Sequence, residues 1–136
     1  MAYIVFYEKP GCAGNARQKE FLIGEGHTLE LRNLLTWPWT REALLEFLDE
    51  LPVVRWFNGS APRVKSGAVV PERLDREQAL QLLLAEPLLI RRPLMVCAGR
   101  HLVGFEPEKV RDWLAHDAAV PAIEGCVASR EGDRER

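Results

Sequence analysis

The sequence lacks several features that would assign a function directly. Its three cysteines, Cys12, Cys97 and Cys126, are too few and too dispersed for a disulfide framework, and no CxxC or Cys/His pair has metal-ligand spacing. With a net charge of −2 it has no basic field for nucleic acid. No apolar run approaches the roughly 18 residues of a membrane span, and the N-terminus does not resemble a secretory signal. We therefore expect a cytoplasmic protein that binds no metal, nucleic acid or membrane.

What is present is an apolar segment that leads into a cysteine. Ile4–Phe6 predicts a buried strand, Lys9–Gly11 a turn, and Ala13–Gly24 a helix that ends at its terminal glycine. Cys12 would lie between strand and helix, beside unpaired N–H groups and the positive end of the helix dipole. This setting favours the thiolate, so Cys12 is a candidate nucleophile. The alternative is a structural cysteine buried in a tight turn.

The remaining sequence alternates strands and helices. Thr28–Arg32 alternates polar and apolar residues, which predicts a strand parallel to the first. The segment at about residues 40–86 is helical in pattern, apart from an expected exposed loop at 58–71. Its helices are expected to begin after Thr40 and after Asp75, which forms a capping pair with Gln78.

The C-terminal part predicts two strands and a helix. Leu94–Ala98 and His101–Gly104 would form a hairpin about Gly99–Arg100, and Pro107 would open the last helix. The pattern fades in the tail, residues 117–136, whose charged end is expected to be disordered.

This order of elements predicts an α/β protein with a small mixed β-sheet. The β-α-β start and the β-β-α end are the two parts of a thioredoxin-like fold, with a helical insertion at about residues 40–86 between them. We expect a single domain over residues 1–116.

Several of these features together resemble one family. Cys12 in the first turn, the helical insertion and Leu89–Leu94 (LIRRPL) before a hairpin are similar to the family that includes the thioredoxin-fold arsenate reductases and the Spx regulators. A finer match resembles its nitrogenase-associated branch, which is found in nitrogen-fixing bacteria. The finer match comprises Phe6–Cys12, Asn15, Arg17–Lys19, Trp56–Asn58 and Ala61–Gly67.

The resemblance implies a redox role for Cys12. Its sulfur would attack an arsenate-like oxyanion and form a covalent adduct, which external glutathione and a glutaredoxin would resolve. No bound cofactor is implied, because the second thiol comes from outside the chain. The implied partners are a small oxyanion and either glutaredoxin or a nitrogenase-related protein.

The resemblance also implies an anion site beside this cysteine. Arg92 would hold the oxyanion through its guanidinium and lower the pKa of the thiol, and Pro93 would be cis. Gly11, Asn15 and Arg17 would be further anion-binding residues.

Two positions depart from the reductases. By this resemblance, two further arginines of the anion site fall at Gly59 and Gly104, and neither glycine carries a charge. Arg63, Lys65 and Arg100 are the candidates to replace them. Two lost charge-assisted contacts would weaken anion binding by the order of a hundredfold or more.

A non-catalytic reading remains open beside the enzymatic one. The scaffold would then serve as an interaction or regulatory protein linked to nitrogen fixation, with Trp37–Trp39 and the loop at Arg63–Lys65 as contact surfaces, although the tryptophans could instead fill a seam under the insertion. A third reading, a regulator like Spx, is disfavoured because that type carries a CxxC switch and position 15 is Asn. Cys126 is either idle or a resolving thiol for Cys12.

Overall fold

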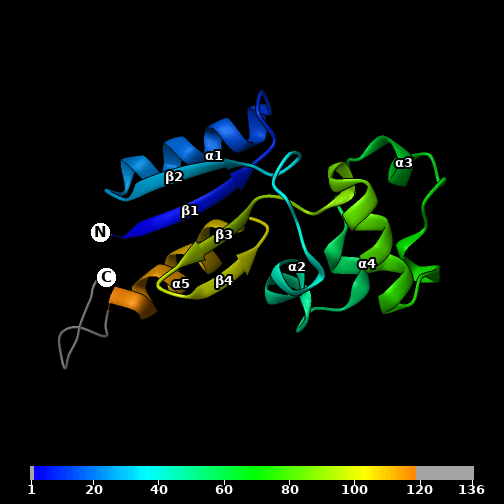
Figure 1. The fold of residues 1–136 in the computed structure, drawn as a ribbon. Helices are drawn as coiled ribbons and strands as arrows, with labels where there is room; N and C mark the ends of the chain where they lie inside the picture. Colours follow the sequence, from blue (N-terminus) through cyan, green and yellow to red (C-terminus); the bar gives the residue numbers. More distant parts are fainter. Residues whose placement is uncertain (1, 119–136) are drawn as a thin grey trace.

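The computed structural model describes residues 2–118, so the predictions for Cys126 and most of the tail lie outside the described residues. Four strands and five α-helices are present in this part of the chain (Figure 1). In chain order they are β1 (Tyr3–Glu8), α1 (Ala13–Gly24), β2 (Thr28–Asn33), α2 (Arg41–Leu48), α3 (Pro62–Lys65), α4 (Arg76–Ala85), β3 (Leu94–Cys97), β4 (Arg100–Val103) and α5 (Pro107–Ala118). Helix α5 therefore continues past the predicted domain boundary at residue 116.

The four strands form one mixed sheet in the order β2-β1-β3-β4. β1 pairs with β2 in parallel, and the α1 crossover between them makes the predicted β-α-β unit. β3 pairs antiparallel with both β1 and β4, which completes the β-β-α half. The predicted mixed sheet is confirmed, and β1, the strand that leads to Cys12, lies at its centre.

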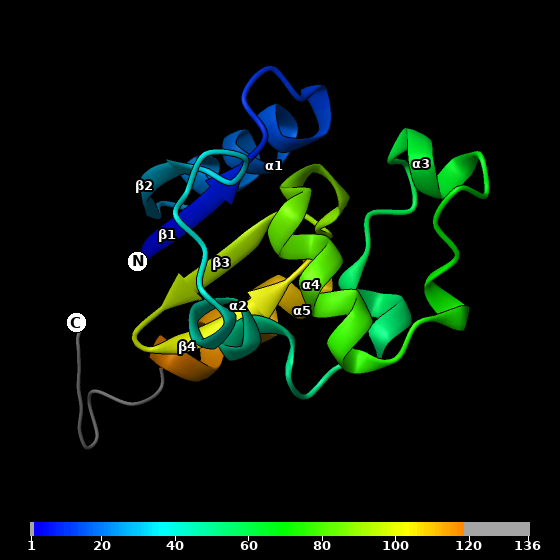
Figure 2. The same cartoon turned by 45° about the vertical axis from the view of Figure 1, so that its right-hand side comes forward.

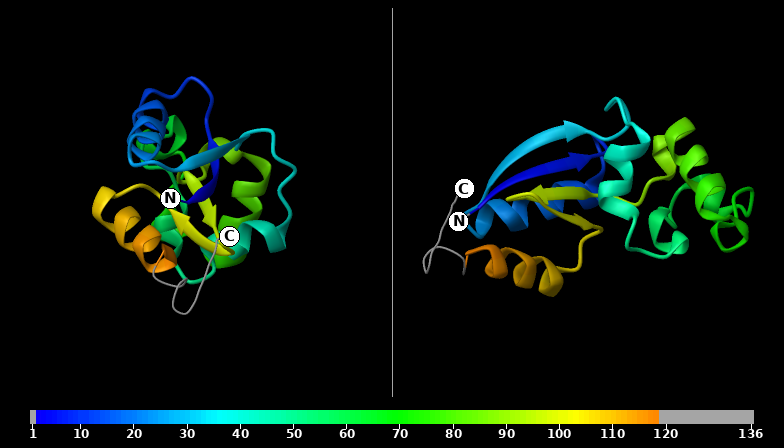
Figure 3. Two further views of the ribbon diagram at one scale, coloured as in Figure 1. Left: turned by 90° about the vertical axis from the view of Figure 1, so that its left-hand side faces the viewer. Right: turned by 60° about the horizontal axis from the view of Figure 1, so that its bottom comes forward.

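Helices cover the two faces of the sheet differently. α1 and α5 lie on one face, and α2 with the inserted segment lies toward the other (Figures 2 and 3). Alternate residues of β1 face opposite sides of the sheet. Ile4 and Phe6 are fully buried in the core formed with α1 and α5, whereas Tyr7 belongs to the core of the insertion. Tyr7 packs edge-on against Trp37 and Phe47, so the tryptophan segment contributes to the seam between sheet and insertion.

Capping side chains fix both main helices of the insertion, as predicted. The Thr40 hydroxyl accepts the Ala43 N–H at 3.1 Å at the start of α2. At the start of α4, Asp75 and Gln78 form a reciprocal capping box. These caps place the helix starts where the sequence indicated.

The middle of the insertion is joined to the segment that follows it. Phe57 and Ile90 form an isolated antiparallel bridge. The Asn58 N–H donates to the Leu89 carbonyl at 2.8 Å, and the Arg91 N–H donates to the carbonyl of buried Trp56 at 2.9 Å. The insertion is thereby anchored next to the segment that carries Arg92.

Two local predictions were wrong. The hairpin turns at Ala98 and Gly99, with φ of +52° and +79°, and Arg100 already belongs to β4. The expected exposed loop at 58–71 contains the short helix α3 and buries Ala61 and Val69, because these side chains pack into the core of the insertion.

A half-buried histidine gives the fold a pH dependence. His27 Nδ1 accepts the Ala2 N–H at 3.0 Å, and burial lowers the pKa of His27. Because its folded pKa lies below the unfolded value of about 6.5, the unfolded chain binds more protons in acid, and stability falls as the pH drops below about 6.5. We expect His27→Gln, which keeps an acceptor but does not titrate, to lose less stability than the wild type in urea unfolding at about pH 5 compared with about pH 7. Equal losses in the two proteins would contradict this role.

None of the helices in residues 2–118 is both long and apolar enough to cross a bilayer. Nor do His, Cys, Asp and Glu side chains of these residues gather in a group that could hold a metal ion.

Candidate functional site

Cys12 lies at the junction between β1 and α1, as predicted. It is the N-cap residue of α1: its carbonyl accepts the Ala16 N–H at 3.0 Å, and its own N–H donates to the Lys9 carbonyl at 3.1 Å. Gly11 makes the turn with φ of +81°, a conformation that favours glycine. The thiol is partly exposed, so it is accessible to a reactant from solvent.

The surroundings of Cys12 favour its thiolate. The thiol forms no regular capping hydrogen bond, but backbone N–H groups of the first helical turn face the sulfur. The pKa of Cys12 is lowered chiefly by the Asn15 N–H, against a raising effect of burial, and further by the Arg92 guanidinium and the Gly14 N–H. The helix N-terminus and one cation therefore act together on the sulfur.

Arg92 contributes more than an effect on the thiol. Its guanidinium lowers the pKa of Cys12, yet its Nη1 atom is buried with no hydrogen-bond partner among residues 2–118. A buried charged donor left without an acceptor is costly, so such an atom indicates that a further acceptor belongs at the site. The peptide bond between Arg92 and Pro93 is cis, as the family resemblance implied.

The Asn15 side chain, predicted as an anion ligand, is engaged within the turn itself. It is only 2% exposed; Oδ1 accepts the Lys9 N–H at 3.0 Å, and Nδ2 donates to Gln18 at 2.8 Å. The side chain thus braces the Cys12 turn, while only the backbone N–H faces the sulfur. Arg17 is exposed on α1 and is not among the groups that lower the pKa of Cys12.

The three candidates to replace the missing arginines lie elsewhere. Arg63 forms an ion pair with Glu86, within the insertion. Lys65 is exposed at the end of α3. Arg100 donates to the Trp113 carbonyl at 2.5 Å and lies over the indole ring, which directs it toward α5. None of the three is among the groups that lower the pKa of Cys12.

A different arginine, which sequence reasoning did not favour, lies at one of the two glycines. A Cβ atom added to Gly104 would be 2.6 Å from Nε and 3.0 Å from Nη2 of Arg91, so the Arg91 guanidinium occupies the space of a side chain at position 104. The Gly104 N–H donates to the Pro93 carbonyl at 2.9 Å, which places Arg91 beside the cis peptide. No carboxylate among residues 2–118 pairs with Arg91. At Gly59, by contrast, no atom fills the corresponding space.

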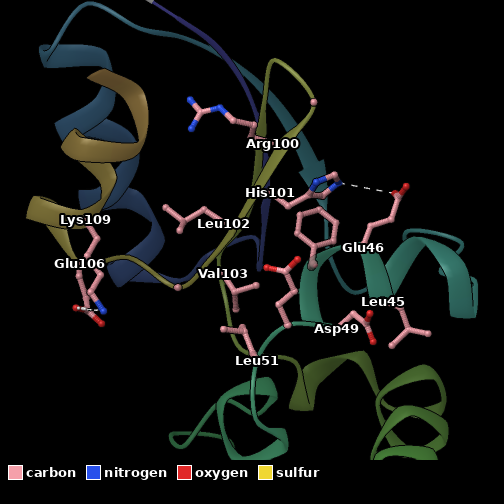
Figure 4. Close-up of a pocket in the computed structure, with 14 residues that line it drawn as sticks. Leu45, Glu46, Asp49, Leu51, Arg100, His101, Leu102, Val103, Glu106 and Lys109 are labelled. Atoms are coloured by element: carbon pink, nitrogen blue, oxygen red, sulfur yellow. Dashed lines mark ion pairs between the residues drawn. The ribbon is translucent and has the colours of Figure 1, made fainter. Parts of the chain in front are cut away.

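A separate pocket lies at the edge of the sheet. It has a volume of about 560 Å³, and its walls come from α2, β4 and the start of α5 (Figure 4). Neither Cys12 nor Arg92 lines it. This pocket is therefore a second feature of the surface, distinct from the thiol site.

Comparison with known sequences gives two kinds of relative. The family model described as ArsC family matches residues 40–113. A 15.7 kDa protein of Rhodospirillum rubrum, described as uncharacterized and in the draG 3′ region, is 43% identical over 98% of this chain and 94% of its own length. The global transcriptional regulator Spx of Streptococcus pyogenes is 22% identical over 84% of this chain and 87% of its own.

Solved structures show the same fold. An ArsC family related protein from Bacteroides fragilis is 27% identical, with a TM-score of 0.70 over 80% of this chain and 95% of its own. An arsenate reductase from Vibrio cholerae is 22% identical, with a TM-score of 0.67 over 82% of this chain and 97% of its own. The similarity thus covers the sheet and insertion together.

Proposed function

Because the chain belongs to the ArsC family and has its thioredoxin-like fold, we propose that it is a thiol oxidoreductase that acts on a small tetrahedral oxyanion through Cys12. The observation that carries this proposal is the unpartnered, buried Nη1 of Arg92 beside an activated thiol. One side chain supplies both a cation for the sulfur and a free donor for an anion. An oxyanion bound to Arg92 would be held within reach of the nucleophile.

The first step is attack by the Cys12 thiolate on the central atom of the oxyanion. The sulfur forms a bond to that atom, and one oxygen leaves as water after taking up protons. Arg92 would hold the remaining oxygens and stabilise their charge. The lowered pKa of Cys12 increases the fraction of thiolate at a given pH.

The second step needs electrons from outside the chain. For arsenate, reduction of arsenic(V) to arsenic(III) takes two electrons, which two thiols supply when they become a disulfide. No second cysteine lies at CxxC spacing from Cys12. We therefore propose glutathione, with a glutaredoxin, as the external reductant, which requires a reducing compartment such as the cytoplasm.

Arg91 is proposed as the second cation of the anion site. Its guanidinium stands over Gly104 without a carboxylate partner in residues 2–118, next to the Arg92–Pro93 peptide. It would restore one of the two charges that the glycines remove. Anion binding is then expected to be weaker than with three guanidinium groups but stronger than with Arg92 alone.

A non-catalytic role linked to nitrogen fixation is the second candidate. The observation in its favour is the 43% identical relative, whose description places it in the draG 3′ region and assigns it no reaction. In this role the activated Cys12 would be a redox-sensitive contact residue for a partner protein.

The rate of Cys12 alkylation against pH tests the proposed chemistry. We expect a reaction midpoint below the ordinary thiol value of about 8.5 and slower alkylation when arsenate, phosphate or sulfate is bound. Mass spectrometry of peptides separates Cys12 from buried Cys97, which serves as an internal control. Turnover with glutathione and glutaredoxin follows, with Cys12→Ser as the inactive control. An ordinary midpoint without protection by any oxyanion would rule out the oxidoreductase proposal.

A further inference from the structure

Strand β4 is an edge of the sheet with backbone groups directed outward. Arg100 follows a two-residue turn, and the Gly104 N–H donates to Pro93, so residues 100, 102 and 104 face β3 in the antiparallel ladder. The residues between them, His101 and Val103, direct their N–H and C=O groups away from β3. Such a row of groups is a template for a further strand.

The outward edge of β4 is set in a groove. The pocket of about 560 Å³ has α2 on one side of the strand and the start of α5 on the other (Figure 4). His101 and Val103 both line it, so the outward backbone groups border a cavity rather than an open flat surface. Leu51 and Leu102 supply apolar wall on either side. A single extended chain would therefore meet backbone partners and side-chain contacts together.

The groove carries an excess of acidic side chains. Glu46, Asp49, Glu50 and Glu106 line it, against two permanent cations, of which Lys109 pairs with Glu106 and Arg100 is directed toward α5. Asp49 pairs with Arg76, which does not line the groove, and a Glu46 oxygen lies 3.7 Å from Nε2 of His101. Most of these carboxylates lie on the α2 wall. Glu50 is exposed and forms no ion pair within residues 2–118. The α2 wall therefore suits a positively charged side chain.

We propose that the edge of β4 is a docking site for an extended, basic segment of a partner protein, which adds to the sheet as a fifth strand. Hydrogen bonds to His101 and Val103 hold its backbone. Alternate side chains of the segment face the α2 wall, where lysine or arginine meets Glu46 and Glu50. This docking does not depend on the chemistry of Cys12, whose site is separate from the groove.

The acidic excess favours a basic partner over a second copy of the chain. Two copies paired edge to edge through β4 would bring the same carboxylates toward one another, and like charges facing each other across an interface oppose association. The chain as a whole also has a net charge of −2.

Binding of a short, fluorescent peptide of alternating lysine and valine tests the proposal. We expect the full-length protein to bind it at least about tenfold more tightly than a peptide of alternating glutamate and valine, and more weakly as salt rises. Val103→Pro removes one outward N–H and leaves the β3 ladder intact, so it should weaken binding by about fivefold to tenfold. Val103→Ala, which keeps the N–H, is the matched control and should bind nearly as the wild type does.

Charge variants test the proposal independently of the proline variant. Glu50→Lys should weaken binding of the basic peptide, whereas Glu20→Lys on the distant helix α1 makes the same change of charge and should not. NMR shifts should centre on the amides of His101 and Val103. Equal affinity for both peptides, or unchanged binding by Val103→Pro, would overturn the proposal. So would a dimer of the protein alone that Val103→Pro dissociates, because a second copy would then occupy the edge.

Discussion

Replacing Arg92 with alanine is expected to weaken the protection of Cys12 by oxyanions strongly and to raise the pKa of its thiol. The variant removes both the guanidinium that lowers the pKa of Cys12 and the buried donor Nη1. Charge-assisted hydrogen bonds contribute about 1.5–3 kcal/mol each, so anion affinity should fall by about tenfold to a hundredfold or more. The alkylation rate of Cys12, measured against pH and oxyanion concentration, gives both quantities from one protein.

Further variants separate the effect of the planar arginine geometry from the effect of its charge on anion protection and on the pKa of Cys12. Arg92→Lys keeps the charge but loses the planar fork, so it should retain part of the pKa shift and little of the anion protection. Arg91→Ala should weaken protection with a smaller effect on the pKa of Cys12, because Arg91 is not among the groups that shift it. Arg55→Ala removes an exposed arginine of the insertion and serves as the control. Full anion protection in Arg92→Ala would contradict the assigned site.

The largest loss of stability is expected from Trp56→Ala. The Trp56 side chain is 0% exposed, its Nε1 donates to the Leu51 carbonyl at 3.0 Å, and the Arg76 guanidinium lies 5.0 Å from the centre of its ring. Truncation of such a buried aromatic ring removes its packing and leaves a cavity, at a cost of about 3–5 kcal/mol in the free energy of unfolding. Urea unfolding, followed by circular dichroism, measures this difference.

Val54→Ala is the matched control for this truncation. Val54 lies in the same short 3₁₀ helix, Val53–Trp56, but is 45% exposed, so its loss should change the unfolding free energy by no more than about 0.5 kcal/mol. Similar losses in the two variants would show that the insertion is held by its helix termini rather than by its core.

The elements predicted most closely were those whose ends are marked by local chemistry. Helix α1 spans Ala13–Gly24, as its terminal glycine indicated, and the capping box fixed the start of α4. The hairpin turn was placed one residue late because alanine rarely takes the positive φ that Ala98 adopts. The segment 58–71 looked like a solvated loop because its apolar residues are sparse; the burial of Ala61 and Val69 depends on contacts with distant parts of the insertion.

The candidate site was predictable where it rests on one local motif. The position of Cys12 follows from the strand, turn and helix around it. The contacts of the Asn15 side chain could not be predicted in this way, because a buried amide that braces a turn and an exposed anion ligand have the same sequence signature. Arg91 could not have been chosen over Arg63, Lys65 or Arg100, because only the folded sheet brings position 91 against Gly104.

The order in which the chain is synthesised separates β1 and Cys12 from the elements that complete their surroundings. β1 and Cys12 leave the ribosome early, but Arg92 and β3 follow about eighty residues later. Until then the nascent chain carries a strand that can pair with β2 alone and a thiol without its guanidinium. The contribution of Arg92 to the acidity of the thiol therefore arises only once the sheet is complete.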